Sequence, residues 1–134
     1  IGYVGSEYAF AQKIPYATFQ NQRGEWVEPT AETISAAASG EIPADTRTSI
    51  TNSNAAGAYP IATFTWVIIY KEQNYSDRSK EQAVATLDLL QYILSDNAQN
   101  ITSEVHYAPL PTKAKELSLK NLKTVTYDGV TILQ

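Results

Sequence analysis

"YPIATFTWVIIYK", residues Tyr59 to Lys71, is a proline-containing run in which polar residues almost vanish. Its second half, Trp66 to Tyr70, shows no alternation of apolar and polar residues. A strand with one wet face alternates, whereas a strand covered on both faces is continuously apolar. The sequence therefore predicts a central strand in a sheet that helices cover on each side.

The composition is that of ordinary soluble protein, and it excludes several classes. The chain has 134 residues, a net charge of −4 and no cysteine. An acidic chain with ten Lys and Arg lacks the positive patch that binds nucleic acid, so we expect no nucleic-acid partner. The longest apolar run is far shorter than the roughly 20 residues of a membrane helix. Without cysteine the chain forms neither disulfides nor thiolate metal sites.

The first residues suggest that the chain is a fragment of something larger. The sequence contains no Met, and "IGYVG" at residues 1–5 is typical of the end of a strand entering a turn. An intact gene product seldom begins inside an element, so we expect further chain before Ile1.

Capping residues and turn signals predict five helices and two hairpins around the apolar run. Helices are expected to begin near Ser6, Thr30, Ser79, Ser95 and Thr112, and hairpins to turn at residues 21–24 and at Asp128-Gly129. The predicted helix of residues 79–95 has an apolar stripe made of Val84, Leu87, Leu90, Ile93 and Leu94. Residues 41–54 are polar and lack periodicity, which is typical of a linker or a functional crossing.

No catalytic or metal-binding constellation is visible. His106 is the only histidine, and a loop role is favoured over a metal ligand or a base. The sequence has no phosphate-binding glycine loop and no nucleophile motif, so we expect no enzyme, no metal and no cofactor. "NYS" (74–76) and "NIT" (100–102) match the glycosylation pattern, which occurs often by chance.

The chain also contains nine tyrosines, which allow a carbohydrate-binding or aromatic-ligand surface. The structural alternative, a buried ring with a wet hydroxyl near a strand end, is favoured. The tyrosines considered are Tyr3, Tyr8, Tyr16, Tyr59, Tyr70 and Tyr107.

Several motifs occur in an order that resembles one protein family. They are "IGYVGSEYAFAQ" (1–12), "WVEPTAETISAAASG" (26–40), "SITNSNAAGAYPIATFTWVIIYKEQ" (49–73), "LDLLQYILSDNAQN" (87–100) and "VHYAPLP" (105–111). Together they resemble the C-terminal portion of phosphate-binding proteins, the extracytoplasmic receptors of high-affinity phosphate ABC transporters. The resemblance extends from Ile1 to about Lys123.

The resemblance implies an α/β fold, the C-terminal fragment of a two-lobed type II periplasmic-binding-protein fold with a mixed sheet flanked by helices. Residues 1–42 would be the end of the second lobe, residues 43–54 the inter-lobe crossing, and residues 55–134 the C-terminal part of the first lobe. The neighbours of the predicted central strand would come from the N-terminal half of such a protein. If they are absent, large side chains of residues 59–71 would meet water, and we expect the fragment to self-associate.

The resemblance also implies where phosphate binds. The family holds it with Ser/Thr hydroxyls, backbone amides at helix N-termini, an Arg and an Asp. The motifs that supply these groups precede the matching region, so no ligand-binding, catalytic or metal residue is expected within this fragment. Arg23, Arg47 and Arg78 lie in turn or loop contexts that do not match the family's phosphate arginine.

The implied function is that of a non-enzymatic solute-binding protein, which captures inorganic phosphate and delivers it to an ABC transporter permease. The implied location is the periplasm, or the outer face of the membrane through a lipid anchor. Two alternatives stay open at this stage. One is a receptor for another oxyanion, and the other is a stand-alone α/β interaction module.

Overall fold

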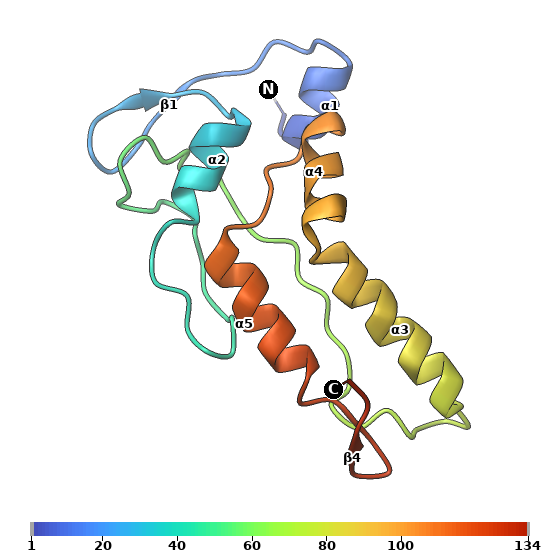
Figure 1. The fold of residues 1–134 in the computed structure, drawn as a ribbon. Coiled ribbons are helices and arrows are strands. Elements are labelled where there is room, and N and C mark those ends of the chain that lie inside the picture. Colours follow the sequence, from blue (N-terminus) through green and yellow to red (C-terminus); the bar gives the residue numbers. More distant parts are fainter. Residues whose placement is uncertain (1, 134) are drawn as a thin grey trace.

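Five helices and two short β-hairpins make up the part of the chain that this computed structural model describes, residues 2–133 (Figure 1). The helices are α1 (Ser6–Ala11), α2 (Ala31–Ala37), α3 (Lys80–Ile93), α4 (Asp96–Glu104) and α5 (Thr112–Leu122). The antiparallel strand pairs are β1 (Phe19–Gln20) with β2 (Trp26–Val27) and β3 (Thr126–Tyr127) with β4 (Val130–Thr131). Each predicted helix and hairpin therefore forms near its predicted place.

Capping side chains set the starts of three helices as the sequence predicts. The hydroxyls of Thr30, Ser79 and Ser95 each accept a hydrogen bond from a backbone N–H in the first turn of α2, α3 and α4. These bonds satisfy amide groups that have no partner within the helix itself. At α1 the prediction is wrong by one residue, because Ser6 lies inside the helix and Gly5 occupies the cap position.

The C-terminal hairpin turns through two residues in the left-handed region, Asp128 at φ 52° and Gly129 at φ 74°. This pair of positive φ values is the requirement of a tight two-residue hairpin, which Asp-Gly meets at little steric cost. The turn prediction is thus confirmed.

The central strand predicted for residues 59–71 does not form. Nothing in this range is a β-strand, and the first β-bridge along the segment is the isolated parallel bridge of Glu72 with Thr126. Ladder hydrogen bonds need a strand alongside, and among the described residues the sheets are two separate two-stranded hairpins. The predicted mixed sheet is therefore absent from residues 2–133, although helices and strands do combine as expected of an α/β sequence.

The strand expected at the start of the chain is also absent. Residues 2–5 have no regular structure, and Tyr3 and Val4 are exposed. Ile1, which belonged to that prediction, lies outside the described residues. As for residues 59–71, a strand here would need a neighbouring strand to accept and donate its ladder hydrogen bonds, and this requirement explains why the predicted strand does not form.

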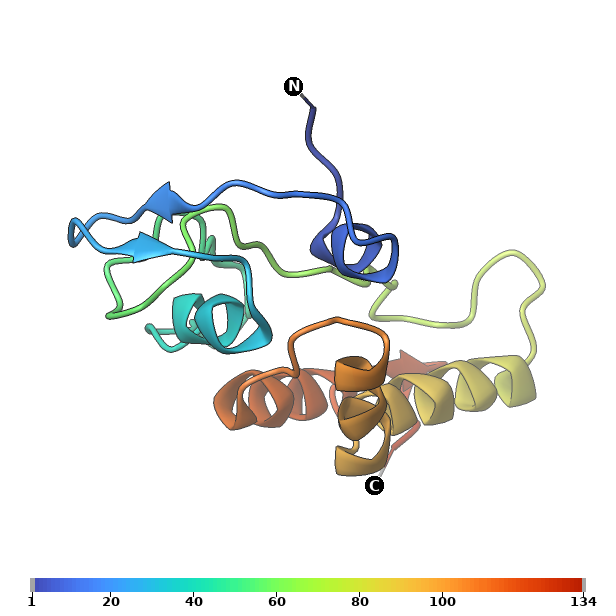
Figure 2. The ribbon, with the colours of Figure 1, turned by 90° about the horizontal axis from the view of Figure 1, so that it is seen from above.

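The helices α3, α4 and α5 lie on one side of the segment that connects residues 62 and 71. This segment passes between α5 and α3 in the view of Figure 1 and lies above them in the perpendicular view of Figure 2. Leu87 of α3 is fully buried, whereas Ile93, predicted to lie inward, is 42% exposed. The apolar stripe is therefore buried in the middle of α3 and open at its C-terminal end.

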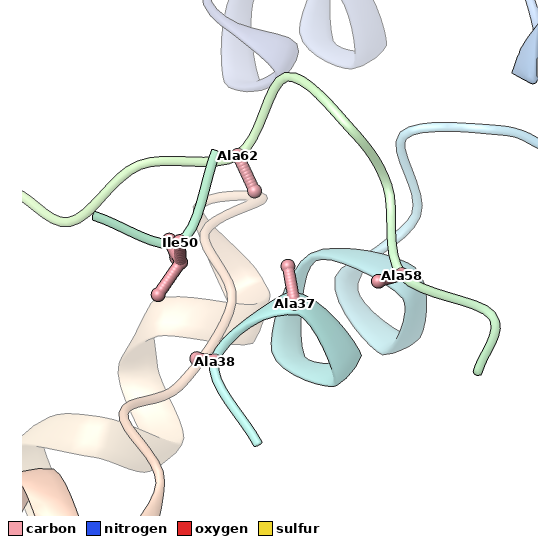
Figure 3. Close-up of a cluster of buried hydrophobic side chains, with 5 residues drawn as sticks. All are labelled: Ala37, Ala38, Ile50, Ala58 and Ala62. Carbon is pink, nitrogen blue, oxygen red and sulfur yellow. The ribbon is translucent and has the colours of Figure 1, made fainter. Parts of the chain in front are cut away.

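A small cluster of buried apolar side chains lies in the N-terminal half of the chain. Ala37 and Ala38 at the end of α2 pack with residues of the polar stretch and of the segment that follows it (Figure 3). Those residues are Ile50, Ala58 and Ala62, with Ile34, Ala55 and Phe64 packed against the cluster. These contacts run between residues 1–42 and 55–134, which the resemblance assigns to different lobes.

Candidate functional site

The most unusual surface is an exposed apolar segment, Thr63–Tyr70, which we term the apolar span. Ile68 is 92% exposed, Tyr70 69% and Val67 65%, while Trp66 is 45% exposed. No backbone N–H of the apolar span donates a hydrogen bond within residues 2–133. An exposed apolar segment with unpaired amides is typical of a surface that another strand covers.

The apolar span is held at both of its ends. Before it, the Thr51 hydroxyl donates to the Ala62 carbonyl at 3.1 Å, and the Asn52 N–H donates to the Pro60 carbonyl at 2.7 Å. After it, the Thr126 N–H donates to the Lys71 carbonyl at 2.8 Å. The span is therefore a tethered segment rather than a free loop.

Glu72 holds the C-terminal end of the apolar span, next to Lys71, in place. One carboxylate oxygen accepts from the N–H groups of Asn74 at 2.9 Å and Asp128 at 3.0 Å. The other accepts from the Thr126 hydroxyl at 2.8 Å and the Gly129 N–H at 3.1 Å. These hydrogen bonds, led by the one from the Asn74 N–H, lower the pKa of Glu72 to about 2. The carboxylate thus joins the apolar span to the turn of the C-terminal hairpin.

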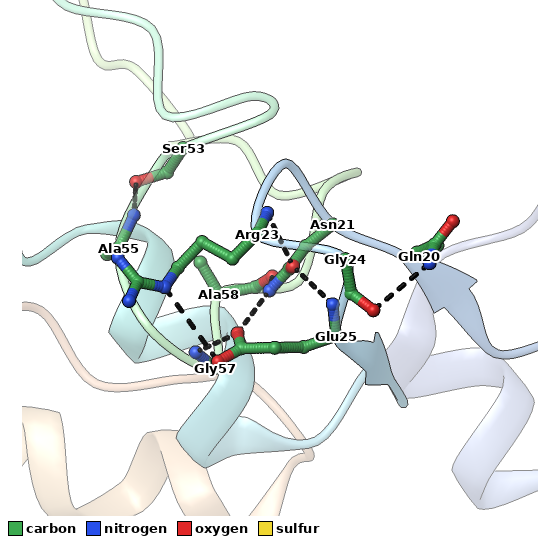
Figure 4. A network of polar contacts seen from close by, with 9 residues as sticks. All are labelled: Gln20, Asn21, Arg23, Gly24, Glu25, Ser53, Ala55, Gly57 and Ala58. Carbon is green, nitrogen blue, oxygen red and sulfur yellow. Dashed lines mark hydrogen bonds and ion pairs between the residues drawn. The ribbon is translucent and has the colours of Figure 1, made fainter.

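A second polar network joins the β1–β2 hairpin to the loop before the apolar span (Figure 4). Buried Asn21 accepts from the N–H groups of Arg23 and Glu25 and donates to the Glu25 carboxylate and the Ala58 carbonyl. The Glu25 carboxylate also accepts from the Gly57 N–H at 2.8 Å. The Asn21 hydrogen bond is the largest cause of the lowered pKa of Glu25, and the Gly57 bond is the next. This network positions Gly57 and Ala58, from which the chain continues toward the apolar span.

The three arginines considered in the sequence are each engaged locally. Arg23 pairs with Glu25 at 3.8 Å and Arg47 with Asp45 at 2.9 Å, both at the surface. Arg78 donates to the Gln82 carbonyl and the Thr86 hydroxyl beside an open hollow of about 590 Å³. These contacts use only part of the donor capacity of each guanidinium group, and the buried Nε of Arg78 has no hydrogen-bond partner among the described residues.

His106 and several tyrosines make contacts with other aromatic rings. His106 follows α4, and its ring lies 5.8 Å from the ring of Phe10. The described residues contain no group of three or more candidate metal ligands. The tyrosines lie beside different partners, including Phe10 beside Tyr16, Phe19 beside Tyr59 and Tyr75 beside Tyr70. The expectation of buried rings is wrong for most of the tyrosines considered, because five of the six are at least 45% exposed: Tyr3, Tyr8, Tyr16, Tyr70 and Tyr107.

Neither of the two glycosylation tripeptides presents a free asparagine side chain in a surface loop. The Asn74 side chain donates to the Asp128 carboxylate, and Asn100 lies within α4.

In residues 2–133, no helix combines the length and apolar character needed to cross a lipid bilayer.

Comparison with known proteins identifies the relatives of this chain. No protein-family profile matches it. It is 37% identical over 114 residues to the phosphate-binding protein PstS of Xylella fastidiosa strain Temecula1, and this alignment covers 83% of the chain. The chain matches a segment of the PstS phosphate-binding proteins. The same name belongs to a Methanocaldococcus jannaschii relative, 29% identical over 93% of the chain, and to a Haemophilus influenzae relative, 30% identical over 83%.

The match is to part of each PstS protein only. The chain spans about a third of the length of these relatives, 30% for the Xylella protein and 34% for the Methanocaldococcus protein. The family resemblance seen in the motifs is therefore confirmed. The absence of phosphate ligands from these 134 residues stays a prediction.

The polar networks of Asn21 and Glu72 were not foreseen from the sequence. For Asn21 a local signal exists, since Asn three residues before Gly24 is typical of a turn in which the amide bonds nearby backbone. Glu72 has no such signal, because Thr126, Asp128 and Gly129 lie more than fifty residues further along the chain.

Proposed function

We propose that this chain is part of an extracytoplasmic solute-binding protein that captures inorganic phosphate for uptake by an ABC transporter. The observation that carries the proposal is the similarity to PstS proteins over 83% to 93% of the chain. The relatives are binding proteins by name, and the proposed role is accordingly non-enzymatic. Its partners are phosphate and the transporter permease, and its location is the periplasm or, through a lipid anchor, the extracellular face of the membrane.

The proposed architecture is the two-lobed type II periplasmic-binding-protein fold. Residues 1–42 belong to one lobe, residues 43–54 form the crossing, and residues 55–134 belong to the other lobe. The polar, aperiodic stretch between the lobes suits a segment that must bend when the lobes close.

In this proposal the groups that bind phosphate come from the remainder of the receptor. The turn and loop contexts of Arg23, Arg47 and Arg78, which do not match the phosphate arginine of the family, support this. The net charge of −4 also disfavours a dianion on this part alone.

A chimeric receptor tests the proposed function. The matching segment of the Xylella PstS protein is replaced by these 134 residues, and phosphate binding is measured by isothermal titration. We expect saturable phosphate binding by the chimera within about tenfold of the affinity of the Xylella protein, a loss of about 1.4 kcal/mol or less. Titration with sulfate is the control for a receptor of another oxyanion. A chimera that folds by circular dichroism but binds no phosphate would contradict the proposal.

The 134-residue chain by itself is the second sample. We expect no saturable heat with phosphate at low salt, because the phosphate ligands are proposed to lie elsewhere. A dissociation constant at or below about 1 μM, roughly −8 kcal/mol, would show instead that this chain holds the site.

A further inference from the structure

Asp128-Gly129 is the one place in the sequence where a glycine follows an Asp or Asn residue. This dipeptide is chemically labile, because the backbone nitrogen of the glycine can attack the side-chain carboxyl carbon of the aspartate. Glycine has no Cβ that would shield this nitrogen or restrict its backbone rotation. The reactivity is therefore concentrated at the turn of the C-terminal hairpin.

The turn is open to water. Asp128 and Gly129 are both exposed, and a Cβ built on Gly129 would lie more than 4 Å from every described residue other than its chain neighbours. Burial therefore does not shield the reactive pair. Protection of the pair has to come from the conformation of the turn and from its hydrogen bonds.

The conformation of the turn opposes the reaction. Both central residues have positive φ, 52° at Asp128 and 74° at Gly129, as in a type I′ turn, in which ψ of the first central residue is about +30°. In the five-membered succinimide ring, the Gly129 nitrogen eclipses Cβ of Asp128, which requires a ψ far from this value. The turn must therefore open before the ring can close.

Hydrogen bonds from one distant segment hold both reacting groups. The Gly129 N–H donates to the Glu72 carboxylate at 3.1 Å, and the Asp128 N–H donates to the other oxygen of the same carboxylate at 3.0 Å. The Asn74 side-chain amide donates to the Asp128 carboxylate. Rotation of the peptide between Asp128 and Gly129 toward the ring geometry pulls the Gly129 nitrogen away from Glu72, so the reaction has to break this bond.

We propose that Asp128 is a site of isoaspartate formation, and that Glu72 and Asn74 clamp the Asp128-Gly129 turn and suppress this modification in the folded chain. The clamp is independent of the proposed phosphate-binding function. Every contact that forms it lies within residues 72–131, including the pairing of Tyr127 with Val130 next to the turn.

The reaction is an isomerisation that needs only water. The Gly129 nitrogen forms a bond to Cγ of Asp128, and the hydroxyl of the neutral carboxyl group leaves with the amide proton as water. Water then opens the ring. Attack at Cγ restores aspartate, whereas attack at the backbone carbonyl leaves the chain linked through Cγ as isoaspartate. The backbone gains one CH₂ group, which a two-residue turn cannot absorb without losing the register of its strands.

Ageing of the 134-residue chain at neutral pH tests the suppression. One sample stays folded and a second is unfolded in guanidinium chloride. The tryptic peptide of residues 124–134 is then examined by chromatography and electron-transfer mass spectrometry, which distinguish isoaspartate from aspartate. We expect isoaspartate at Asp128 to accumulate at least about tenfold more slowly in the folded sample, because the reaction requires the open turn.

Two variants test the clamp. We expect Glu72→Gln and Asn74→Ala each to form isoaspartate at Asp128 at least about threefold faster than the folded wild type. Glu116→Gln and Asn54→Ala make the same kinds of change at other exposed positions and should leave the rate unchanged. Circular dichroism shows whether each variant is folded. If Glu72→Gln does not fold, Asn74→Ala and the comparison of folded with unfolded wild type decide.

Three results would overturn the proposal. The first is equal accumulation of isoaspartate in the folded and unfolded wild type, which would mean that the turn gives no protection. The second is slower accumulation in Glu72→Gln than in the wild type, because the carboxylate would then assist the attack by taking the amide proton. The third is acceleration by the control variants as large as that by the clamp variants.

Discussion

At the scale of single residues, two polar side chains organise backbone that lies far from them in the sequence. Asn21 is buried, and its amide donates to the Ala58 carbonyl across 37 residues. Glu72 is exposed, but its carboxylate accepts from the Asp128 and Gly129 N–H groups across more than fifty residues. Each therefore links elements that chain proximity does not bring together.

Replacing Glu72 by Gln should loosen the C-terminal hairpin. One of the two carboxylate oxygens becomes an amide group that donates, so it faces N–H groups that need an acceptor. We expect the Asp128 and Gly129 amides to exchange with solvent about tenfold faster, as measured by hydrogen-exchange NMR. Glu116→Gln, at an exposed position of α5, is the matched control and should leave these rates unchanged.

Acid should release the same hairpin. The pKa of Glu72 is lowered to about 2 in the folded chain from an ordinary value of 4.5. A lowered carboxyl pKa means that its stabilising effect is complete above the ordinary pKa and is lost as the pH falls from about 4.5 through about 2. The Gly129 amide chemical shift should titrate over this range in the wild type. In Glu72→Gln that titration should be absent, and its persistence would assign the effect to another group.

Replacing Asn21 by Ala should destabilise residues 19–62. The substitution leaves the buried Ala58 carbonyl without its side-chain donor and removes the acceptor of the Arg23 and Glu25 amides. An unsatisfied buried polar group costs about 1–3 kcal/mol, and we expect a loss of this size in urea unfolding. Asn54→Ala, at an exposed position, should change the free energy of unfolding by less than about 0.5 kcal/mol.

At the scale of elements, α3 shows how neighbouring apolar residues differ. Leu87 is fully buried and Leu89 is 58% exposed, although both are leucines of the same helix. The caps and periodicity predicted the helix and its extent. Which end of its apolar stripe is covered depends on the packing of α4 and α5.

Leu87→Ala and Leu89→Ala should therefore have different effects on stability. Removing a buried leucine side chain costs about 2–5 kcal/mol because it loses burial and leaves a cavity. Removing the exposed one should cost less than about 1 kcal/mol. Urea denaturation followed by circular dichroism compares the two, and equal losses would show that Leu89 is covered in solution.

At the scale of the whole molecule, the buried contacts divide into two groups joined by the apolar span. Residues 19–62 contain the alanine-rich cluster and the Asn21 network, and residues 71–133 contain α3, α4, α5 and the Glu72 network. A hydrogen bond from the Asn121 side chain to the Ala44 carbonyl, at 3.0 Å, runs between them. Such an arrangement favours two cooperative units over one.

Hydrogen exchange in increasing urea should reveal these units. We expect peptides from residues 19–62 to lose protection at lower urea than peptides from α3 and α5, because the core of the former consists largely of small alanine side chains. Mass spectrometry of the two sets of peptides measures this. A single shared transition would mean that the chain unfolds as one unit.

The sequence by itself determined the features that depend on near neighbours. The caps at Thr30, Ser79 and Ser95 and the turn at Asp128-Gly129 were predicted, because each signal and its effect lie within a few residues. The ordered motifs also predicted the family that the PstS relatives confirm. Local hydrogen bonds form between residues that are close in the sequence, and the order of motifs can be seen in the sequence directly. Neither depends on a tertiary contact.

Only the tertiary structure decided what depends on distant partners. The apolar run of residues 59–71 carries a strand pattern, but a strand also needs a neighbouring strand, and within residues 2–133 the single β-bridge beside this run joins Glu72 to Thr126. The roles of Asn21 and Glu72 likewise appear only when the chain brings Ala58 and Gly129 beside them. Burial of Leu87 rather than Ile93 follows the same rule, because the sequence repeats a pattern along α3 whereas coverage depends on what packs against it.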